Sequence, residues 1–346
     1  MGDRNGLRTT VFEGSAEDWD RRVGELGHGT FCHLSGWRAV LADTLGHETS
    51  WWSAIDESGT VAGILPLARV RSRLFGDYLV SMPFLNDGGP LGDPAARLAL
   101  GRRAAEEAAR LGVDLLELRA RVAVPGDLAV SHRKLTVIKR LPAGTEELWD
   151  KGLRSKVRSQ VRRPIKEGMT ARFGAELVDD FYDVFSRKMR DLGTPVLPKR
   201  FFEAVARAFP AEAVFAVVDF KGRAAAAACG FHYGDEFEIT WAGSLTEYNR
   251  EAPNMLLYWS LMEESIRRGV KAFNFGRCSP DSPTYRFKRQ WGGDDHPLPW
   301  AQWSAREVAA MPNPDSPKFR LATSVWSRLP LRITNVLGPW VSRSLP

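Results

Sequence analysis

The sequence predicts an α/β protein with mixed sheets, in which one structural unit occurs twice and a C-terminal tail follows. Three observations lead to this prediction. The chain has 346 residues, about twice the ~150 of a typical single domain. Apolar residues make up 44% and charged residues 26%, which excludes a disordered or collagen-like chain. Finally, the same order of helices and strands can be traced in both halves of the sequence.

The first copy begins with two amphipathic helices near 15–26 and 35–45, and Ser15 is the expected N-cap. A β-hairpin at 51–70 follows, because a Ser-Gly pair separates two apolar runs and places Gly59 in the turn. We expect the copy to continue through a strand, a Gly-rich loop, a helix and a last strand, with the regular elements at 78–85, 96–112 and 113–119.

The second copy repeats this order. Two helices precede a hairpin with Gly222 in its turn, and a strand, a helix and a last strand follow it. The corresponding ranges are 176–192, 199–209, 214–233, 236–243, 255–269 and 270–277. The helix before the last strand ends in both copies on a glycine, Gly112 or Gly269, which suits the left-handed position after a helix. The order matches the acyltransferase fold called GNAT. We therefore predict an N-terminal GNAT-like domain at 1–145, a second one at 146–305 and a tail at 306–346.

A strongly basic segment joins the two copies. Residues 151–166 contain seven Lys or Arg residues and no acidic residue. At helical spacing Arg154, Arg158 and Arg162 share one face, and Pro164 should interrupt the helix. A solvated linker helix is one interpretation. Because no acidic neighbour can neutralise the segment, we favour a surface that contacts phosphates, in keeping with the net charge of +6.

The strongest motif is Tyr-Arg-Phe-Lys-Arg-Gln-Trp-Gly-Gly at 285–293. It resembles the Y-x-F-K-x-x-[FW]-G signature of the FemAB/FemX family, tandem-GNAT peptidyltransferases that move an amino acid from aminoacyl-tRNA to a cell-wall precursor. The stretches RSQVRRPIKEGM, EYNREAPNMLLYW and KAFNFGR match as well. Together they look most like the branch associated with exosortase/PEP-CTERM and exopolysaccharide loci. The resemblance covers about 30–305.

The resemblance implies a substrate cleft between the two domains and a last strand that returns to the first domain. It also implies that Lys288, the lysine of the motif, contacts the acceptor and its phosphates, so this residue is the candidate catalytic group. The alternative is a surface lysine among core aromatic residues. The candidate substrate-binding residues are Tyr285, Arg277, Asn254, Arg158, Arg162 and Trp241.

Acyl transfer to an amine needs little further machinery. Thioesters and aminoacyl esters are already activated, and an α-amino group with a pKa near ~8 is partly unprotonated at neutral pH. His232, His296 and Asp281 are candidate bases, although each also fits a purely structural role. The sequence shows no Ser/His/Asp arrangement, no metal-ligand cluster and no P-loop, so we expect neither a metal nor a tightly bound cofactor.

The residues leave two acyl donors open. The loop before the second helix 255–269 contains Arg250 but lacks the [QR]-x-x-G-x-[GA] pattern that cradles coenzyme A, which weakens acyl-CoA as the donor. In the first copy Gly88, Gly89 and Gly92 precede a helix that starts near 93, and they could form either an anion site or a capped turn. Aminoacyl-tRNA is the donor that the resemblance implies, with acyl-CoA as the alternative co-substrate.

The tail 317–346 contains five basic residues and no acidic residue among Leu, Val and Trp. It could form amphipathic helices at an anionic membrane surface or pack on the first domain. Three scattered cysteines, an N-terminus without a signal sequence and the lack of a ~20-residue apolar run favour the cytoplasm, with the inner membrane face as a candidate contact.

The prediction is therefore a FemAB-type N-acyltransferase that acts on an amine of a lipid- or nucleotide-linked glycan or a peptidoglycan-like precursor in envelope or exopolysaccharide assembly, with tRNA as a further partner. The alternatives are an acyl-CoA-dependent acetyltransferase acting on exopolysaccharide and a non-catalytic module that binds a phosphorylated glycan or RNA.

Overall fold

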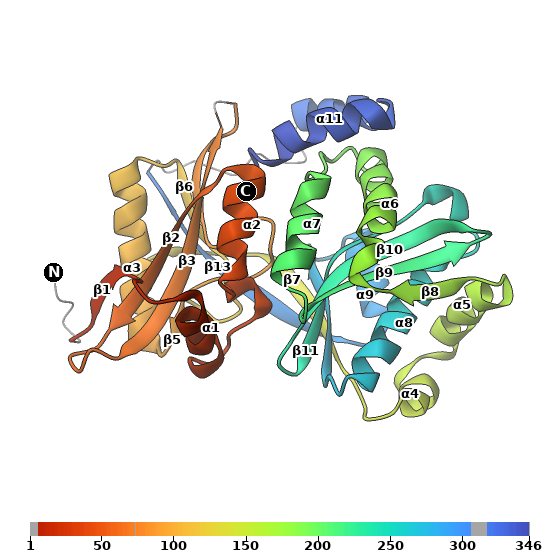
Figure 1. Ribbon diagram of the computed structural model, residues 1–346, viewed down its shortest axis with the longest axis horizontal. Coiled ribbons are helices and arrows are strands. Elements are labelled where there is room, and N and C mark those ends of the chain that lie inside the picture. Colours follow the sequence, from red (N-terminus) through yellow and green to blue (C-terminus); the bar gives the residue numbers. More distant parts are fainter. Residues whose placement is uncertain (1–5, 73, 306–316, 346) are drawn as a thin grey trace. The chain divides into compact units, whose positions relative to one another are not determined.

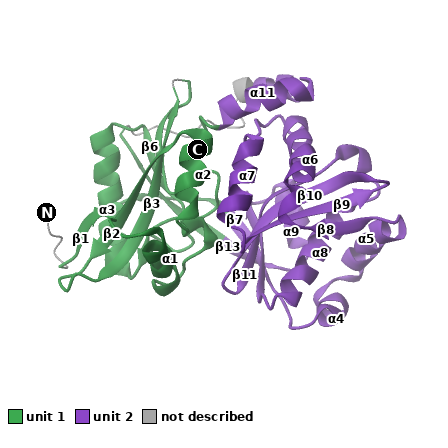
Figure 2. Ribbon diagram, viewed as in Figure 1, with its two compact units in different colours: residues 1–134, 297–313, 343–346 green, residues 135–296, 314–342 purple. Residues whose placement is uncertain are grey.

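The computed structural model describes residues 6–72, 74–305 and 317–345. The chain forms two compact units, coloured separately in Figure 2. Unit 1 comprises residues 1–134, 297–313 and 343–346, and unit 2 comprises residues 135–296 and 314–342.

Unit 1 contains a mixed sheet in the order β1-β2-β3-β4-β6-β13, and the short β5 pairs with β3. All neighbouring strands are antiparallel except β4 and β6, which are parallel. The strands are β1 (Arg8–Val11), β2 (Glu48–Ile55), β3 (Val61–Ser72), β4 (Gly76–Val80), β5 (Leu91–Gly92), β6 (Leu115–Leu118) and β13 (Asp294–Ser304). The predicted hairpin with Gly59 in its turn is confirmed as β2 and β3.

Helices cover both faces of this sheet (Figure 1). Helix α3 (Pro94–Leu111) covers one face, and Trp52, Leu65 and Leu116 belong to the apolar core beneath it. Helices α1 (Ala16–Glu25) and α2 (Gly36–Leu45) cover the other. Ser15 caps α1 as predicted, since its side chain accepts a hydrogen bond from Asp18 N at 3.1 Å.

Unit 2 repeats the arrangement. Its sheet has the order β8-β9-β10-β11-β12-β7, with β11 and β12 parallel and the other pairs antiparallel. The strands are β7 (Ala129–Arg140), β8 (Thr170–Phe173), β9 (Ala213–Phe220), β10 (Arg223–Tyr233), β11 (Glu236–Ser244) and β12 (Ala272–Cys278). This matching order confirms the predicted tandem architecture.

The helices of unit 2 also follow the pattern of unit 1. Helix α8 (Pro253–Arg267) and the basic helix α5 (Ser155–Lys166) pack on one face of the sheet, over a core that includes Val157 and Leu257. Helices α6 (Val178–Asp191) and α7 (Lys199–Ala208) cover the other face (Figure 1). The short α9 (Pro283–Arg289) contacts β12. The remaining short helical segments are η1 (Phe31–His33), α4 (Thr145–Glu147), η2 (Leu148–Gly152), η3 (Ala175–Leu177) and η4 (Thr246–Tyr248).

The compact units differ from the contiguous segments 1–145, 146–305 and 306–346 that we expected. The reason is that the strand beside each parallel pair comes from a distant part of the sequence. In unit 1, β13 pairs with β6 and places Ala301 opposite Leu118, so a last strand does return to the first unit. In unit 2, β7 pairs with β12 and places Ile138 opposite Asn274.

Two local expectations were wrong. Helix α5 does not stop at Pro164 but continues to Lys166, because Pro164 lies in the last turn, where its missing N–H removes only one hydrogen bond. The strand expected at 78–85 ends at Val80. Met82 and Phe84 have φ angles of 56° and 70°, which extended strands do not allow.

The tail forms two helices, α10 (Pro317–Trp326) and α11 (Leu331–Ser342). Both helices belong to unit 2, where α11 packs against α6, whereas residues 343–346 belong to unit 1. The alternative that the tail packs on the first domain therefore holds only for its last residues. Two glycines allow the tail helices to pack closely on unit 2. Gly338 of α11 lies against Val196, and Gly193 lies against Thr323 of α10. Over the part of the chain that the structure describes, no helix has the length and apolarity needed to cross a bilayer.

Candidate functional site

The candidate site lies in unit 2, where the parallel strands β11 and β12 separate. The two strands pair over three residues only, and Glu238 opposite Asn274 is the last pair. A register shift in β10 between Cys229 and Gly230 accompanies the divergence. Where two strands stop pairing, their backbone N–H and C=O groups lose their sheet partners. Here polar side chains lie at the point where β11 and β12 separate.

A buried hydrogen-bonded cluster is centred on Asn274. Its Nδ2 donates to Glu236 Oε1 and to Glu238 Oε2, both at 3.0 Å, and its Oδ1 accepts from Gly276 N at 2.9 Å. Thr136 of β7 also donates to Asn274 Oδ1. Asn274 and Glu238 are only 1% and 2% exposed, so the network holds a carboxylate inside the unit, where an unpartnered one would be costly.

Lys288 adjoins this cluster from α9. Ser282 caps that helix by accepting a hydrogen bond from Tyr285 N at 3.1 Å. The Lys288 side chain is 5% exposed, and its Nζ donates to Gly276 O at 2.6 Å and to Arg277 O at 2.9 Å. Lys288 is therefore not the surface lysine of the alternative interpretation.

Burial also changes the acidity of this lysine. Desolvation lowers the pKa of Lys288 to about 8, although the nearby Cys278 and Glu238 partly oppose this effect. An ammonium whose pKa lies close to neutral pH is either a cation that can hold an anion or, once deprotonated, a base.

The structure places the other predicted site residues in three settings. Arg277 lies at the end of β12 and its carbonyl binds Lys288. The Tyr285 hydroxyl donates to Asp295 Oδ2 at 2.8 Å, which raises the pKa of Tyr285, and Asn254 is half-buried in the first turn of α8. Trp241 lies apart from these residues, in an aromatic cluster with Phe201, Phe202 and Phe231.

The two arginines predicted on the basic helix have intramolecular contacts. Arg158 Nη1 donates to the carbonyls of Trp149, Asp150 and Leu153 at 3.1, 2.8 and 3.1 Å. The Arg162 guanidinium lies 5.2 Å from the centroid of the Trp149 ring. Five basic side chains of α5 and its N-cap residue are exposed: Arg154, Lys156, Arg162, Arg163 and Lys166.

The candidate bases differ in environment. Burial lowers the pKa of His232 to about 4, so this imidazole is neutral and a weak base at pH 7. His296 and Asp281 are exposed. Sequence reasoning missed Glu238 and Asn274, the most deeply buried polar residues of the cluster. The available signal was a charged or amide side chain inside the apolar strands 236–243 and 270–277.

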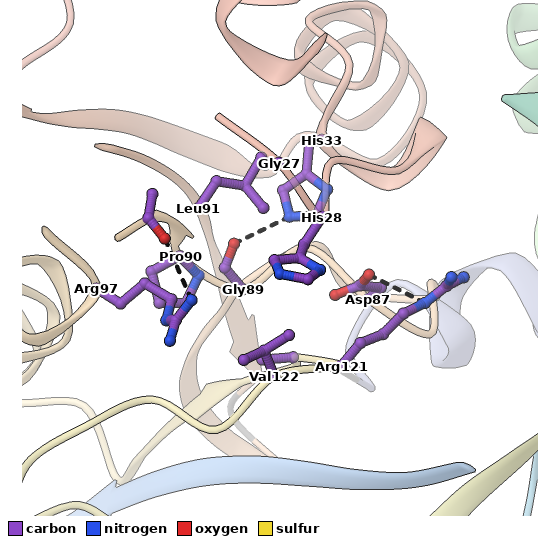
Figure 3. A pocket seen from close by; sticks show the side chains of 12 residues that line it. Gly27, His28, His33, Asp87, Gly89, Pro90, Leu91, Arg97, Arg121 and Val122 are labelled. Atoms are coloured by element: carbon purple, nitrogen blue, oxygen red, sulfur yellow. Dashed lines mark hydrogen bonds and ion pairs between the residues drawn. The ribbon is translucent and has the colours of Figure 1, made fainter. Parts of the chain in front are cut away.

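The glycine loop of unit 1 is a packed turn. Gly89 lies against Ala120, and Gly92 has a φ of 118° and lies against the carbonyl of Ala62. Figure 3 shows the small pocket beside this loop, with a cavity volume of about 10 Å³, room for roughly one water molecule. A diphosphate does not fit this cavity, and Asp93 caps the following helix by accepting from Ala96 N at 2.7 Å.

Both pocket arginines already have partners (Figure 3). Arg97 Nη1 donates to Gly92 O at 3.2 Å, and Arg121 Nε lies 3.3 Å from Asp87 Oδ2. The pocket therefore supports the capped-turn alternative for this loop.

The position in unit 1 that corresponds to the candidate site contains an ion pair. The last pair between the parallel strands β4 and β6 is Val80 opposite Glu117. Glu117 Oε1 lies 2.9 Å from Arg119 Nε, and both side chains are at most 3% exposed. Arg119 Nη1 also donates to Leu85 O at 3.0 Å. In unit 1 the buried Glu117 and Arg119 side chains therefore neutralise each other. The corresponding position of unit 2 instead contains Lys288, whose pKa is lowered, beside the Asn274 cluster.

No group of His, Cys, Asp and Glu side chains among residues 6–72, 74–305 and 317–345 could hold a metal ion.

Comparison with known proteins identifies the fold. Residues 152–289 match the family model described as an acetyltransferase (GNAT) domain. FemX has a similar structure, with a TM-score of 0.65, 15% identity, and coverage of 86% of this chain and 97% of FemX. The C-terminal domain of a putative lysylphosphatidylglycerol synthetase from Agrobacterium fabrum follows at a TM-score of 0.57, 15% identity, and coverage of 83% and 92%.

A tandem GNAT protein from the clavulanic acid biosynthesis pathway is also similar, with a TM-score of 0.53, 14% identity, and coverage of 87% of this chain and 99% of that one. No curated protein sequence matches the chain. The chain thus contains a GNAT domain and has a FemX-like tandem-GNAT fold, as the FemAB/FemX resemblance implied. The exosortase-associated branch stays a prediction.

Proposed function

We propose that this protein is an N-acyltransferase of FemAB type, which transfers an aminoacyl or acyl group to an amine of a glycan or peptidoglycan-like precursor of the cell envelope. The observation that supports this most directly is Lys288. It lies within the matched GNAT domain, buried beside the Asn274 cluster, with its ammonium fixed by two backbone carbonyls.

In this proposal Lys288 is the catalytic residue. An ammonium has three N–H donors, and Gly276 O and Arg277 O accept two of them. The third is directed to a substrate oxygen, either the oxyanion that develops on the acyl carbonyl or a phosphate oxygen of the acceptor. A charged donor that is already oriented in a partly dehydrated site contributes typically ~10² to 10³ in rate.

The reaction is a substitution at the acyl carbon. The acceptor nitrogen forms a bond to this carbon, and the bond from the carbon to the ester oxygen or thioester sulfur of the donor breaks. The proton that the amine loses ends on the released alcohol or thiol, so no oxidant or further reactant is needed. The Asn274 network fixes the backbone of Gly276 and in this way positions Lys288.

For the donor we propose aminoacyl-tRNA. The similarity of the fold to FemX and to a lysylphosphatidylglycerol synthetase domain, whose name denotes an aminoacyl lipid, supports an aminoacyl group. That tRNA carries this group is what the resemblance of the sequence motif implies. The exposed Lys156, Arg163 and Lys166 of α5 would suit a polyanion such as tRNA or a phosphate-linked glycan. Acyl-CoA is the second candidate, because the matched family model describes an acetyltransferase.

Transfer assays separate these functions. The full chain is incubated with a labelled aminoacyl-tRNA mixture or with labelled acetyl-CoA, each with lipid-linked and nucleotide-linked amino-sugar acceptors. We expect label to move from tRNA to an acceptor amine. Transfer from acetyl-CoA alone would show that acyl-CoA, and not aminoacyl-tRNA, is the donor. Tight acceptor binding without transfer from either donor would favour a binding module.

Variants test the site in the same assay. Lys288→Met should lower the rate at least about 100-fold. The matched control is Lys271→Met, which removes a lysine of the same unit whose side chain is 73% exposed and should leave the rate unchanged. Because a buried substitution can disturb folding, Lys288→Arg is measured too, and thermal unfolding is recorded for every variant. Full activity in a folded Lys288→Met protein would remove this residue from the site.

A further inference from the structure

The helix α11 is bound to unit 2 by its polar side. Its buried residues are Thr334, Gly338 and Ser342, which recur every four residues and lie on one face. A surface helix of a globular protein normally turns its apolar stripe inward and its polar residues outward. Here the small and polar side chains face the protein.

The apolar side of α11 is exposed. Ile333, Val336, Leu337 and Trp340 are exposed by 43%, 64%, 45% and 64%. Their spacing of three and four residues places them within one stripe, since successive helical residues are rotated by roughly 100°. The preceding helix α10 exposes Leu321 by 67% and Val325 by 53%, which are also four residues apart. We call these six residues the tail patch.

The tail patch stands out from the rest of the described surface. Of the eleven large apolar side chains that are exposed among the described residues, six belong to it, although it spans only residues 321–340. Single exposed apolar side chains are ordinary, but a concentration of this kind marks an interaction surface.

The charges around the tail patch have one sign. The segment 316–346 contains five Lys or Arg residues and no Asp or Glu. Arg328 lies between the two helices, and Arg332 and Arg343 lie at the two ends of α11, where all three are exposed. On a helical projection Arg332 and Arg343 fall beside the apolar stripe of α11. Long basic side chains in that position can reach phosphates while the apolar side chains enter a lipid interface.

We infer that the tail patch docks this protein on an anionic lipid surface, with α10 and α11 in the plane of the headgroups. An apolar stripe that contains Trp, flanked by arginines, is the pattern of an interfacial helix. Charge complementarity favours an anionic membrane over a second copy of the chain, because two such tails would bring arginines together without acidic partners. The inference depends on the tail alone and is independent of the proposed reaction.

Vesicle binding tests this inference. The full chain is mixed with sedimentable vesicles of phosphatidylglycerol and phosphatidylcholine in equal amounts, and in parallel with phosphatidylcholine alone. We expect the protein to sediment with the anionic vesicles, and to do so less when the NaCl concentration rises from 0.05 to 0.5 M, because salt screens the arginines. Failure to bind anionic vesicles would overturn the inference.

Variants identify the surface. Ile333→Ser/Val336→Ser/Leu337→Ser should lower the partition coefficient at least about tenfold without changing the thermal midpoint, because these side chains are exposed in the free protein. The matched control is Leu74→Ser/Val130→Ser, which removes exposed apolar side chains of unit 1 and should bind as the wild type does. Equal binding by the triple variant would refute the inference. So would a lipid-free dimer, seen by sedimentation velocity, that the triple variant loses, since the patch would then be a protein interface.

Discussion

Lys288 should make the stability of the protein depend on pH between about 8 and 10.5. Its pKa is about 8 in the folded chain, against an ordinary value of 10.5 that applies when the chain is unfolded. Between these two values the unfolded state binds more protons than the folded state. Stability therefore rises with pH across this window, and below pH 8 the cost of burying the charge is fully present.

The size of the effect follows from the two pKa values. The two pKa values differ by about 2.5, and each pKa unit corresponds to about 1.4 kcal/mol, so the whole window corresponds to about 3 kcal/mol. Between pH 7 and pH 9 the same relation predicts that the wild type gains about 1 kcal/mol from this group. These figures give the order of magnitude of the effect, which is large enough to measure by urea unfolding.

The measurement is urea unfolding followed by tryptophan fluorescence at pH 7, 8 and 9, for the wild type, Lys288→Met and Lys288→Arg. Differences between the wild type and each variant cancel the contributions of other titrating groups. Methionine carries no charge and arginine stays protonated, so neither variant should show the gain between pH 7 and 9. Parallel pH profiles for the wild type and Lys288→Met would show that the lysine is solvated, and the description of the site would be refuted.

Three further predictions concern the framework. Asn274→Ala should lower the free energy of unfolding by about 1–3 kcal/mol in urea titrations, because the buried Glu238 and the half-buried Glu236 lose their amide donor, and an unchanged value would mean that the network is not formed. Gly92→Ala should lower the thermal midpoint more than Gly112→Ala: both glycines have positive φ, but an added Cβ at Gly92 would lie 2.3 Å from a carbonyl oxygen and at Gly112 would meet open space. Arg158→Gln should lower the thermal midpoint, because it breaks hydrogen bonds to three backbone carbonyls. Arg163→Gln should leave the thermal midpoint unchanged and weaken binding to tRNA in a filter assay, because the Arg163 side chain is exposed. The reverse pattern would contradict the assigned roles.

Features that depend on neighbouring residues could be predicted from the sequence. The turn at Gly59 and the cap at Ser15 are set by local backbone preferences, and the structure contains both. Gly112 has the predicted left-handed conformation after its helix, with a φ of 64°. The repeated order of elements, and with it the tandem fold, could be predicted for the same reason.

Features that depend on distant residues could not. The pairing of β13 with β6 joins residues more than 180 positions apart, and no periodicity in either strand encodes its partner. Trp241 was predicted to bind substrate, but the structure packs its ring against Phe201 and Phe202 of the separate helix α7. Lys288 was chosen from a motif, while the carboxylate beside it was missed because single polar residues in apolar strands have no distinctive spacing.

The pairing of β13 with β6 fixes an order of events during synthesis. Unit 2 is built mainly from the continuous stretch 135–296, so its sheet can close as soon as that stretch has left the ribosome. The sheet of unit 1, although made first, keeps the edge of β6 open until residues 301–304 emerge. For most of translation this nascent half presents a strand edge on which another chain could align, and it is the half for which a chaperone would matter most.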